Sequence, residues 1–491
     1  MHTTVHEPPL HRMRLHLPIL AACLLSATGA RASGDAAPPG ARDAATLYAQ
    51  FCANCHGADL QGNKAQSLLD ADWQHGKSDA DITRVIHQGV ASSGMPAFGT
   101  TMTDAEIRAL VVLIRETGTR RVEPAIGRAT ALPAGVQTSE LHSYRIEKII
   151  DGLDVPWSLA FLPDGRLLFT ERTGTLHLAT QSDGHWTTQT ITGAPKVWVR
   201  DEGGLLAIGI PPDYAKTGWI YLTLSDPGDH DTGNTKLVRG RLRDHRWTDE
   251  ETIFAAPRST YTFNGTNFGS RVVFSGDYLF LSFGERGEVG QAQDLSLPNG
   301  KVHRLFLDGR IPPDNPFVHT PGALASIWSY GHRNPQGLAL DPATGDLWET
   351  EHGPRGGDEL NFIRPGRNYG WPVITYGMNY NGTPVTPLTA KDGMEQPALY
   401  WTPSIAVSPI RFYTGDAFPK WKGQLFLGAL AQQELRRLVL DGDRVVHQEL
   451  ILKKFGRVRD MITGPDGFLY VSLEVPGPEN PACIVRLVPA N

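Results

Sequence analysis

The sequence lacks several features that would assign it to a familiar class. Its 491 residues include only 4 cysteines, which excludes a fold held by a framework of disulfides. Basic residues are not in excess, and the formal charge of -6 gives no reason to expect nucleic-acid binding. Beyond the N-terminal leader, no stretch is apolar enough to span a membrane. The 52 Gly, 36 Pro and 20% charged residues indicate a globular protein of two or three domains, not a disordered or fibrous chain.

The N-terminus has the features of an export signal. Arg12 and Arg14 precede an apolar run over residues 17–27, and small residues follow at the usual cleavage spacing. This pattern predicts a signal peptide over residues 1–32 and therefore a periplasmic protein. Two alternatives stay open: an uncleaved membrane anchor, and a lipoprotein in which Cys23 carries the lipid.

A haem-attachment motif follows the leader. Cys52, Cys55 and His56 form the pattern C-x-x-C-H, in which two thiols bond covalently to the haem and the histidine binds its iron. A redox-active C-x-x-C pair or half of a zinc site are the alternatives. In an exported protein the pattern favours one covalent haem c.

The surroundings of this motif have helix signals. Asp43 can cap a helix that runs into the motif, Ser78 can cap a second, and Thr103 with Glu106 forms a capping box for a third, which we expect to end at Gly118. The third helix has apolar residues at helical spacing: Ile107, Leu110, Val111 and Ile114. Three short helices around one haem resemble a small class I cytochrome c.

A methionine loop offers the second axial ligand of the iron. Met95 precedes a proline after the second expected helix, where a small cytochrome c places its Met-Pro loop. Met102, His75 and His87 are the competing ligands, and a methionine can also serve only as core filler.

The composition changes after the expected cytochrome domain, which covers residues 43–118. Residues 119–141 are rich in Ala, Pro, Thr and Gly without apolar periodicity, as in a linker. Residues 142–491 contain short β-branched and aromatic runs separated by Gly, Pro and Asp, which predicts an all-β domain.

The β region repeats a strand, a tight turn and a second strand. Six such units over some 350 residues predict a six-bladed β-propeller, with a pair of β-sandwiches as the alternative. The units cover residues 157–170, 205–224, 268–283, 336–349, 405–430 and 459–473.

Three arginines stand at the starts of repeat units. Arg333 opens the fourth unit, and Arg457 and Arg459 open the sixth, where strand alternation places both guanidinium groups on one side. Together they would suit a polyanionic ligand at the mouth of the tunnel. For each arginine alone, a structural ion pair is the alternative.

A loop rich in acidic residues and glycine follows the fourth unit. Residues 351–359 (EHGPRGGDE) combine carboxylates with flexible backbone, as in sites for a hard cation such as calcium. A solvated acidic turn is the alternative.

Four motifs resemble those of the soluble PQQ-dependent glucose and aldose-sugar dehydrogenases. The resemblance runs from about residue 145 to residue 491, with the motifs in the expected order. Cytochrome c domains are also found attached to quinoprotein dehydrogenases. The motifs are RNPQG at 333–337, EHGP at 351–354, NYGWP at 368–372 and RVRD at 457–460.

The resemblance implies a binding site for the cofactor PQQ. The carboxylates and quinone oxygens would be held by Arg333, Asn334, Arg457 and Arg459. Tyr380 matches a tyrosine that lines the cofactor, and Glu202 stands where a cofactor-contacting glutamine is usual.

The resemblance also implies two calcium sites. The backbone of Gly353 and Pro354 would hold the calcium that polarises the cofactor. Glu359 and Tyr369 match the positions of a second, structural calcium.

Two positions depart from the pattern of the family. Asn267 stands where the family has the histidine that takes a proton from the sugar hydroxyl, and Ala431 stands where a cofactor-binding lysine is common. A carboxamide orients a hydroxyl but is not a base near neutral pH, and losing a general base typically costs about a hundredfold or more in rate.

These patterns lead to one functional hypothesis and two rivals. We expect a periplasmic quinoprotein that oxidises a sugar or related alcohol with PQQ and passes electrons through its own haem to a downstream acceptor. With Asn267 at the catalytic position, water, the cofactor or Glu202 would have to act as base. The rivals are a propeller that binds a ligand without turnover, and a calcium-dependent lactonase-type propeller.

Overall fold

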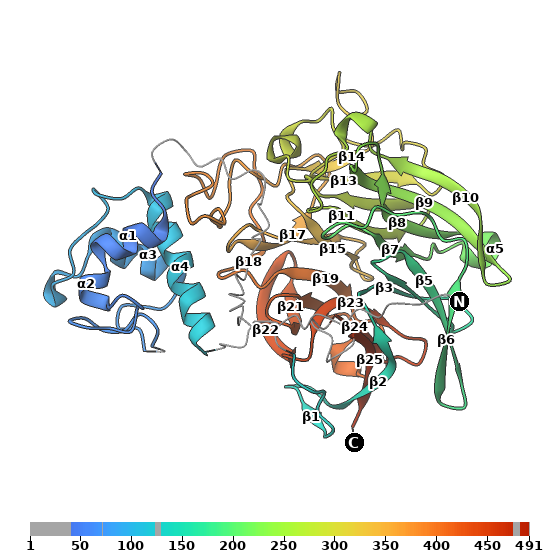
Figure 1. The fold of residues 1–491 in the computed structure, drawn as a ribbon, viewed down its shortest axis with the longest axis horizontal. Coiled ribbons are helices and arrows are strands. Elements are labelled where there is room, and N and C mark those ends of the chain that lie inside the picture. The colour runs from blue at the N-terminus through green and yellow to red at the C-terminus, as the bar shows by residue number, and fades with distance from the viewer. Residues whose placement is uncertain (1–40, 71, 123–128, 475–481, 491) are drawn as a thin grey trace, which may run out of the picture. The chain divides into compact units, whose positions relative to one another are not determined.

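The structure is a computed structural model, and it describes residues 41–70, 72–122, 129–474 and 482–490 (Figure 1). The predicted signal peptide and the lipid site at Cys23 lie outside the described residues. Within the described ranges, no helix is both long enough and apolar enough to cross a bilayer.

The N-terminal domain is helical, as predicted, and its caps are those expected from the sequence. Asp43 accepts a hydrogen bond from the backbone of Thr46 at 2.9 Å, and Ser78 begins its helix with a capping box. Thr103 and Glu106 exchange the predicted capping-box bonds. The elements are α1 (Ala44–Phe51), α2 (Ala53–His56), α3 (Asp79–Gln88), the 3-10 turn η1 (Ala91–Ser93) and α4 (Asp104–Val122).

The prediction that the last helix ends at Gly118 is wrong. Helix α4 continues through Gly118 to Val122 and thus extends into the segment predicted as a linker. A glycine inside a helix costs only about 1 kcal/mol relative to alanine, which the flanking turns offset. Gly118 therefore does not act as a stop signal.

The C-terminal domain is a propeller of six sheets, which confirms the predicted fold class. Each sheet is antiparallel, and sequence neighbours pair within it, except that β2 pairs with β25 in blade 6. Blade 1 contains β3 (Pro156–Phe161), β4 (Leu167–Glu171), β5 (Thr175–Ser182) and β6 (His185–Ile191). Blade 2 contains β7 (Leu205–Gly209), β8 (Ile220–Pro227), β9 (Gly233–Arg243) and β10 (Arg246–Ala255), and blade 3 contains β11 (Gly269–Ser275), β12 (Tyr278–Phe283), β13 (Lys301–Phe306) and β14 (Ile327–Tyr330).

The remaining blades complete the ring. Blade 4 contains β15 (Pro335–Leu340), β16 (Leu347–Glu351), β17 (Asp358–Ile363) and β18 (Leu399–Trp401), and blade 5 contains β19 (Val407–Phe412), β20 (Leu425–Ala429), β21 (Glu434–Asp441) and β22 (Arg444–Lys453). Blade 6 contains β23 (Arg457–Thr463), β24 (Leu469–Glu474) and β25 (Ala482–Pro489), joined by β2 (Ser143–Leu153) and the short β1 (Gln137–Thr138). Between strands lie α5 (Tyr214–Thr217) and the turns η2 (Arg258–Thr260), η3 (Val289–Gln293) and η4 (Pro419–Trp421).

Blade 6 closes the ring by joining the two ends of the β domain. Strand β2, from the start of the domain, pairs antiparallel with β25, from its end. The six predicted repeat units correspond to the first two strands of each blade. Hydrophobic clusters fill the space between neighbouring blades, so that the first strands and the loops before them are available to form a central site.

Helix α4 makes polar contacts with the loops of blade 4. The Arg355 guanidinium pairs with the Glu116 carboxylate at 2.5 Å, and Arg108 donates to the Thr386 carbonyl at 2.6 Å. Met378 packs in the hydrophobic core of the helical domain. The helical domain is thus in contact with Arg355 of the predicted calcium loop and with Met378 and Thr386 of the longer loop after β17.

Candidate active site

Arg457 and Arg459 lie on the same side of β23, as alternation predicted. Both pair with Glu474 on β24, Arg457 at 3.3 Å and Arg459 at 2.7 Å. Burial alone would raise the pKa of Glu474, but the two guanidinium groups hold it below its usual value. The ion pair predicted as an alternative is therefore present, yet two cations share one carboxylate, and this leaves a net positive charge.

The pKa of one histidine, His352, is affected by the charges of Arg333, Arg457 and Arg459. Burial and the charges of these arginines lower the pKa of His352 to about 3, so the imidazole is neutral. In the described part of the chain, His352 Nε2 is buried and has no hydrogen-bond partner. All three arginines are therefore close enough to His352 for their charges to affect it, a side chain that sequence reasoning did not single out.

Arg333 comes from the loop between β14 and β15 and reaches the predicted calcium loop. Its guanidinium donates to the carbonyls of His352 at 3.2 Å and Gly353 at 3.0 Å. Burial would lower the pKa of Arg333, but Tyr380, Glu285 and other nearby acidic groups raise it. Tyr380, half exposed, therefore lies near Arg333, as the resemblance implied.

Asn334 is fully buried and supports the segment that carries Asn267. Its Oδ1 accepts hydrogen bonds from the Gly269 backbone at 3.0 Å and from Gln336 at 3.1 Å. Its Nδ2 is buried and has no partner among the described residues. One end of this side chain is structural, and the other end can donate to a ligand.

Asn267 is held by two carboxylates. Its backbone has a φ of 56°, in the left-handed region that asparagine tolerates. The backbone N–H donates to Glu202 Oε2 at 2.9 Å, and the side-chain Nδ2 donates to Glu285 Oε1. Glu202 itself is exposed, whereas Asn267 and Glu285 are buried.

Glu285 is a residue of the site that sequence reasoning missed. It follows β12, and its backbone N–H donates to the Arg333 carbonyl at 2.9 Å. Burial raises the pKa of Glu285 to about 7, although Arg333 and its bond to Asn267 oppose this. Its second oxygen, Oε2, is buried without a partner in the described residues. No motif contains Glu285, so only the fold could reveal it.

A glycine brings Glu285 against Asn267. A Cβ on Gly284 would lie 2.0 Å from the Asn267 carbonyl oxygen, so no other residue fits there without displacing the backbone. The next residue, Arg286, is fully buried and donates to the carbonyls of Asn264 and Thr266. This arginine fixes the loop that ends at Asn267.

The predicted calcium loop is anchored by Asp358. This buried carboxylate accepts from the backbone of Gly353 at 3.0 Å, from the Ser404 hydroxyl at 2.5 Å and from the Ile405 backbone at 2.9 Å. The anchor leaves the carbonyls of Gly353 and Pro354 as the oxygen donors predicted for calcium. The Gly353 carbonyl accepts from Arg333, so a cation would share it with this arginine.

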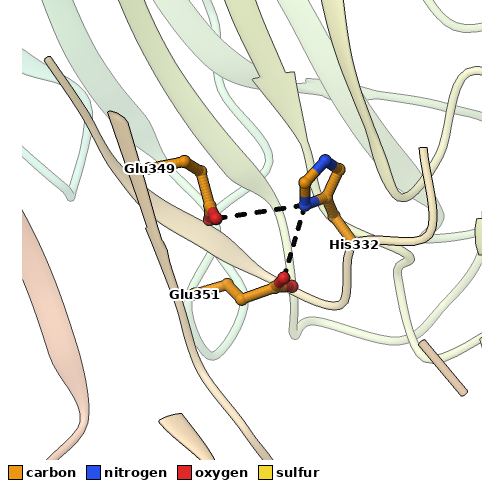
Figure 2. A group of neighbouring side chains, drawn as sticks. All are labelled: His332, Glu349 and Glu351. Carbon is orange, nitrogen blue, oxygen red and sulfur yellow. Dashed lines mark hydrogen bonds and ion pairs between the residues drawn. The ribbon is translucent and has the colours of Figure 1, made fainter. Parts of the chain in front are cut away.

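A buried group of acidic residues adjoins this loop. Figure 2 shows His332, Glu349 and Glu351 turned toward one another, with His332 Nδ1 at 3.9 Å from Glu349 and 3.3 Å from Glu351. Asn361 Nδ2 donates to Glu349 at 3.1 Å, and also to Glu351 and Glu359. Burial and the charge of Glu351 raise the pKa of both Glu349 and Glu359.

This group could hold a metal ion. Glu349 Oε1 and Asn361 Oδ1 are buried and lack partners among the described residues. The alternation of Glu349 and Glu351 on β16 was a signal in the sequence, but their convergence with His332 depends on the pairing of β15 with β16.

Tyr369 has no free hydroxyl for a metal ion, and Ala431 has no charge that could bind the cofactor. The Tyr369 hydroxyl donates to the Phe362 carbonyl at 2.6 Å and accepts from the Arg364 backbone, so its carbonyl is the oxygen left for a metal. Its ring stacks on His332 at 4.8 Å. Ala431 lies in the turn between β20 and β21 and brings no charge, but Gln433 nearby has a buried amide without partners in the described chain.

The haem motif leaves one imidazole nitrogen of His56 available for iron. The motif spans the end of α1 and α2, and its cysteines Cys52 and Cys55 are free. His56 Nδ1 lies 2.8 Å from the Gln66 carbonyl, which can only accept, so Nδ1 carries the proton and Nε2 is free for iron.

The methionine loop is fixed by backbone bonds. Val90 and Met95 bond to each other through N–H and carbonyl at 2.9 and 3.1 Å, and the Met95 side chain packs against the helical core. Met102 is buried in that core, whereas His75 and His87 are exposed. Met95 stays the predicted second ligand.

The fold and both sites define a class: a β-propeller dehydrogenase fused to a cytochrome c domain. The chain belongs to the Glucose / Sorbosone dehydrogenase family, whose profile matches residues 153–479. Residues 39–114 match the profile described as cytochrome C oxidase, cbb3-type, subunit III.

Individual relatives agree with this assignment. The aldose sugar dehydrogenase YliI of Escherichia coli (strain K12) is 42% identical over 358 residues, which cover 70% of this chain and 93% of that protein. The apo-form structure of the soluble aldose sugar dehydrogenase from Escherichia coli matches with a TM-score of 0.66 and covers 71% of this chain and 100% of that one. The PQQ-bound aldose sugar dehydrogenase from Streptomyces coelicolor is 27% identical, with a TM-score of 0.56 and coverage of 73% and 100%.

Proposed function

We propose that this protein oxidises a sugar or related alcohol with PQQ in the propeller and passes the electrons, one at a time, to its own c-type haem. The observation that carries the proposal is that Arg457 and Arg459 share the single carboxylate of Glu474, while Arg333 donates to the Gly353 carbonyl of the predicted calcium loop. We further propose that the protein acts in the periplasm and delivers electrons to a downstream acceptor. The relatives named for aldose sugar dehydrogenase activity support the substrate class.

The residues present fit PQQ. A tricarboxylate needs several cationic donors, and Glu474 neutralises only one of the two arginines on β23. Asn334 Nδ2 is a buried donor without an acceptor among the described residues, and His352 Nε2 is a buried polar atom that a ligand could also contact. When bound, PQQ supplies an ortho-quinone that accepts a hydride from the substrate carbon.

The chain's own residues would bind the cofactor and orient the substrate. Arg457 and Arg459 would hold carboxylates of the cofactor, and Arg333 and Asn334 would donate to its remaining oxygens. Asn267, fixed by Glu202 and Glu285, would orient the substrate hydroxyl. The buried residues around the site would exclude bulk water and so strengthen the electrostatic interactions of these groups with the ligand.

Calcium would bind in two places. At the cofactor, the carbonyls of Gly353 and Pro354 are held in place through Asp358. At the second place, Glu359 shares the Asn361 amide with Glu349 and Glu351, and the Tyr369 ring stacks on His332 of the same group. A cation there would neutralise carboxylates that otherwise share a single amide.

The contact between α4 and the calcium loop supports a direct route for electrons. Arg355 follows Pro354 and pairs with Glu116 on α4, where both side chains are largely buried. This contact joins the haem-bearing domain to the loop predicted to lie beside the cofactor.

One experiment tests the proposal. The purified full-length protein, with its haem attached, is incubated with PQQ and calcium. Candidate aldoses and polyols are then added while the absorbance of the reduced haem is recorded. We expect reduction that requires PQQ, calcium and substrate together. No reduction with any aldose or alcohol would contradict the proposal.

A second function is ligand binding without turnover. It is favoured by Asn267 and Ala431, which stand where the family has a catalytic histidine and a cofactor-binding lysine. Asn267→His restores the histidine of the family. If the propeller has lost only its base, this variant reduces haem where the wild type does not. If wild type already turns over, the binding function is excluded.

A further inference from the structure

We propose that Glu285 is the proton acceptor of this enzyme, in the place of the histidine that Asn267 has replaced. The inference rests on the proposed function and names the residue that completes it. The Asn267 amide, which the resemblance places at the proton-abstraction point, donates to Glu285 Oε1. A base that contacts this amide is within one side chain of the reacting hydroxyl.

Glu285 has a free acceptor atom. One oxygen binds Asn267, and the other, Oε2, is buried and has no partner among the described residues. A buried carboxylate oxygen without a donor is costly, and such orphan atoms in a ligand site call for an explanation. The hydroxyl of a bound substrate, directly or through one water molecule, would provide the missing donor.

Glu285 is also a better base than the rival carboxylate Glu202. Glu202 is exposed and spends one oxygen on the Asn267 backbone N–H at 2.9 Å, so it fixes the loop. Glu285 is 1% exposed, and burial raises its pKa to about 7, which suits a base that works near neutral pH. The charged groups that face it are Arg333 and Arg286, which oppose this rise.

The position of Glu285 is built into the backbone. Gly284 allows the chain to approach the Asn267 carbonyl, Arg286 N–H donates to that carbonyl at 3.2 Å, and Glu285 N–H donates to the Arg333 carbonyl at 2.9 Å. The Glu285 backbone is thereby fixed beside Arg333, the residue predicted to hold the cofactor, and its carboxylate contacts Asn267. Such pre-organisation is what a catalytic base needs.

The proposed step balances. The substrate carbon loses hydrogen as a hydride with two electrons, its hydroxyl loses a proton, and a C=O bond forms. The hydride goes to the quinone, and the proton goes to the Glu285 carboxylate, which becomes a neutral carboxylic acid. Asn267 keeps the hydroxyl aligned throughout and changes no charge.

The test uses the full-length holoprotein with PQQ, calcium and an aldose that reduces its haem. Glu285→Gln keeps the size and the acceptor oxygen toward Asn267 but removes the base, and we expect haem reduction to slow by about a hundredfold or more. Glu288→Gln, an exposed carboxylate in the same loop, is the matched control and should retain the wild-type rate. Asn267→His added to Glu285→Gln should recover at least tenfold.

Two further readouts do not depend on turnover. Infrared difference spectra of the protein without PQQ, wild type against Glu285→Gln, should show one carboxyl group that loses its proton near pH 7. The affinity for PQQ should change less than threefold in Glu285→Gln, because this residue takes the proton and does not hold the cofactor. A loss of PQQ affinity that accounts for the slower turnover would overturn the proposal.

The remaining outcomes separate two failures. If wild type turns over and Glu285→Gln turns over equally fast, Glu285 is not the base, while the proposed function stands. If neither wild type nor Asn267→His reduces haem with any aldose or alcohol although PQQ binds, the proposed function fails, and the role of Glu285 fails with it.

Discussion

The haem site and the arginine site of the propeller are two redox sites built in opposite ways. We call the second site, which contains Arg333, Arg457 and Arg459, the hub. The haem site draws its attachment points and one iron ligand from a run of five residues, Cys52 to His56, on two adjoining helical segments. The hub draws Arg333 from the loop before blade 4 and Arg457 and Arg459 from blade 6. A local site depends on each fixed residue of its motif, whereas in our proposal the propeller site loses the histidine at position 267 and uses Glu285, which the fold brings against Asn267.

The largest expected effect comes from a variant that disrupts the haem site. Cys52→Ala together with Cys55→Ala removes both thiols that bond to haem, so we expect complete loss of covalently bound haem and of haem reduction. Oxidation of substrate with PQQ and an added dye should persist, because the hub is unchanged. Haem-stained denaturing gels and dye assays measure the two properties. Cys483→Ala, a lone buried cysteine, is the control and should keep its haem.

The next effect concerns the charge of the hub. Arg459→Ala removes one of two guanidinium groups that share Glu474, and we expect the affinity for PQQ to fall by about ten- to a hundredfold, as for a lost hydrogen bond to a charged group. Titration calorimetry measures the affinity. Arg310→Ala, an exposed ion pair with Asp308, should bind PQQ as wild type does. Equal affinities for both variants would mean that the β23 arginines are only structural.

The third effect concerns stability and has the opposite sign to the loss of activity. The pKa of Glu285 is about 7 in the fold against a usual 4.5, so its ionisation destabilises the fold as the pH rises through this interval. At pH 8, Glu285→Gln should therefore be more stable by up to about 3 kcal/mol, since one pKa unit corresponds to about 1.4 kcal/mol.

At pH 5 this gain should be much smaller, because Glu285 is then mostly neutral in the folded protein. Melting temperatures of the propeller transition at the two pH values measure the difference. A gain that is the same at pH 5 and pH 8 would show that Glu285 does not titrate in this interval.

Calcium should stabilise the propeller by a smaller amount. A chelator removes the cation from the acidic group near Glu359, and we expect the melting temperature to fall by several degrees, as for a ligand present at about a hundred times its Kd. Glu359→Gln should reduce this calcium dependence. Glu251→Gln, which changes an exposed carboxylate paired with Arg239, should retain it. A melting temperature that calcium leaves unchanged in wild type would exclude a structural site.

The smallest effect concerns the contact between the two domains. Glu116→Gln weakens the pair with Arg355, and we expect electron transfer to the haem to slow by about two- to tenfold, as for the loss of a partly buried ion pair. Stopped-flow absorbance measures the rate. Glu147→Gln, which breaks a pair with Arg486 in blade 6, should have no effect. Equal rates in all three proteins would show that the contact does not assist the transfer.

Much of this architecture was predictable because its signals are local. The capping residues Asp43 and Ser78 begin their helices as expected, and the repeated strand-turn-strand units became the inner strands of six blades. Gly118 failed as a stop signal because a single interior glycine costs little when the turns on both sides continue the helix.

The site was predictable only in part. Strand alternation placed Arg457 and Arg459 together, but their partner Glu474 comes from the neighbouring strand and could not be inferred. Glu285 was missed because its role depends on the approach of Gly284 to Asn267, which is a tertiary contact. The group of His332, Glu349 and Glu351 likewise forms only when the loop after β14 meets β16.

The central claim is that a sugar's electrons pass from the hub to the haem within one molecule. Stopped-flow mixing of the PQQ- and calcium-loaded protein with saturating aldose, repeated over a hundredfold dilution of the protein, tests this directly. An intramolecular transfer predicts first-order haem reduction with the same rate constant at every dilution. A rate constant that falls in proportion to protein concentration, or a haem that stays oxidised, would contradict the account.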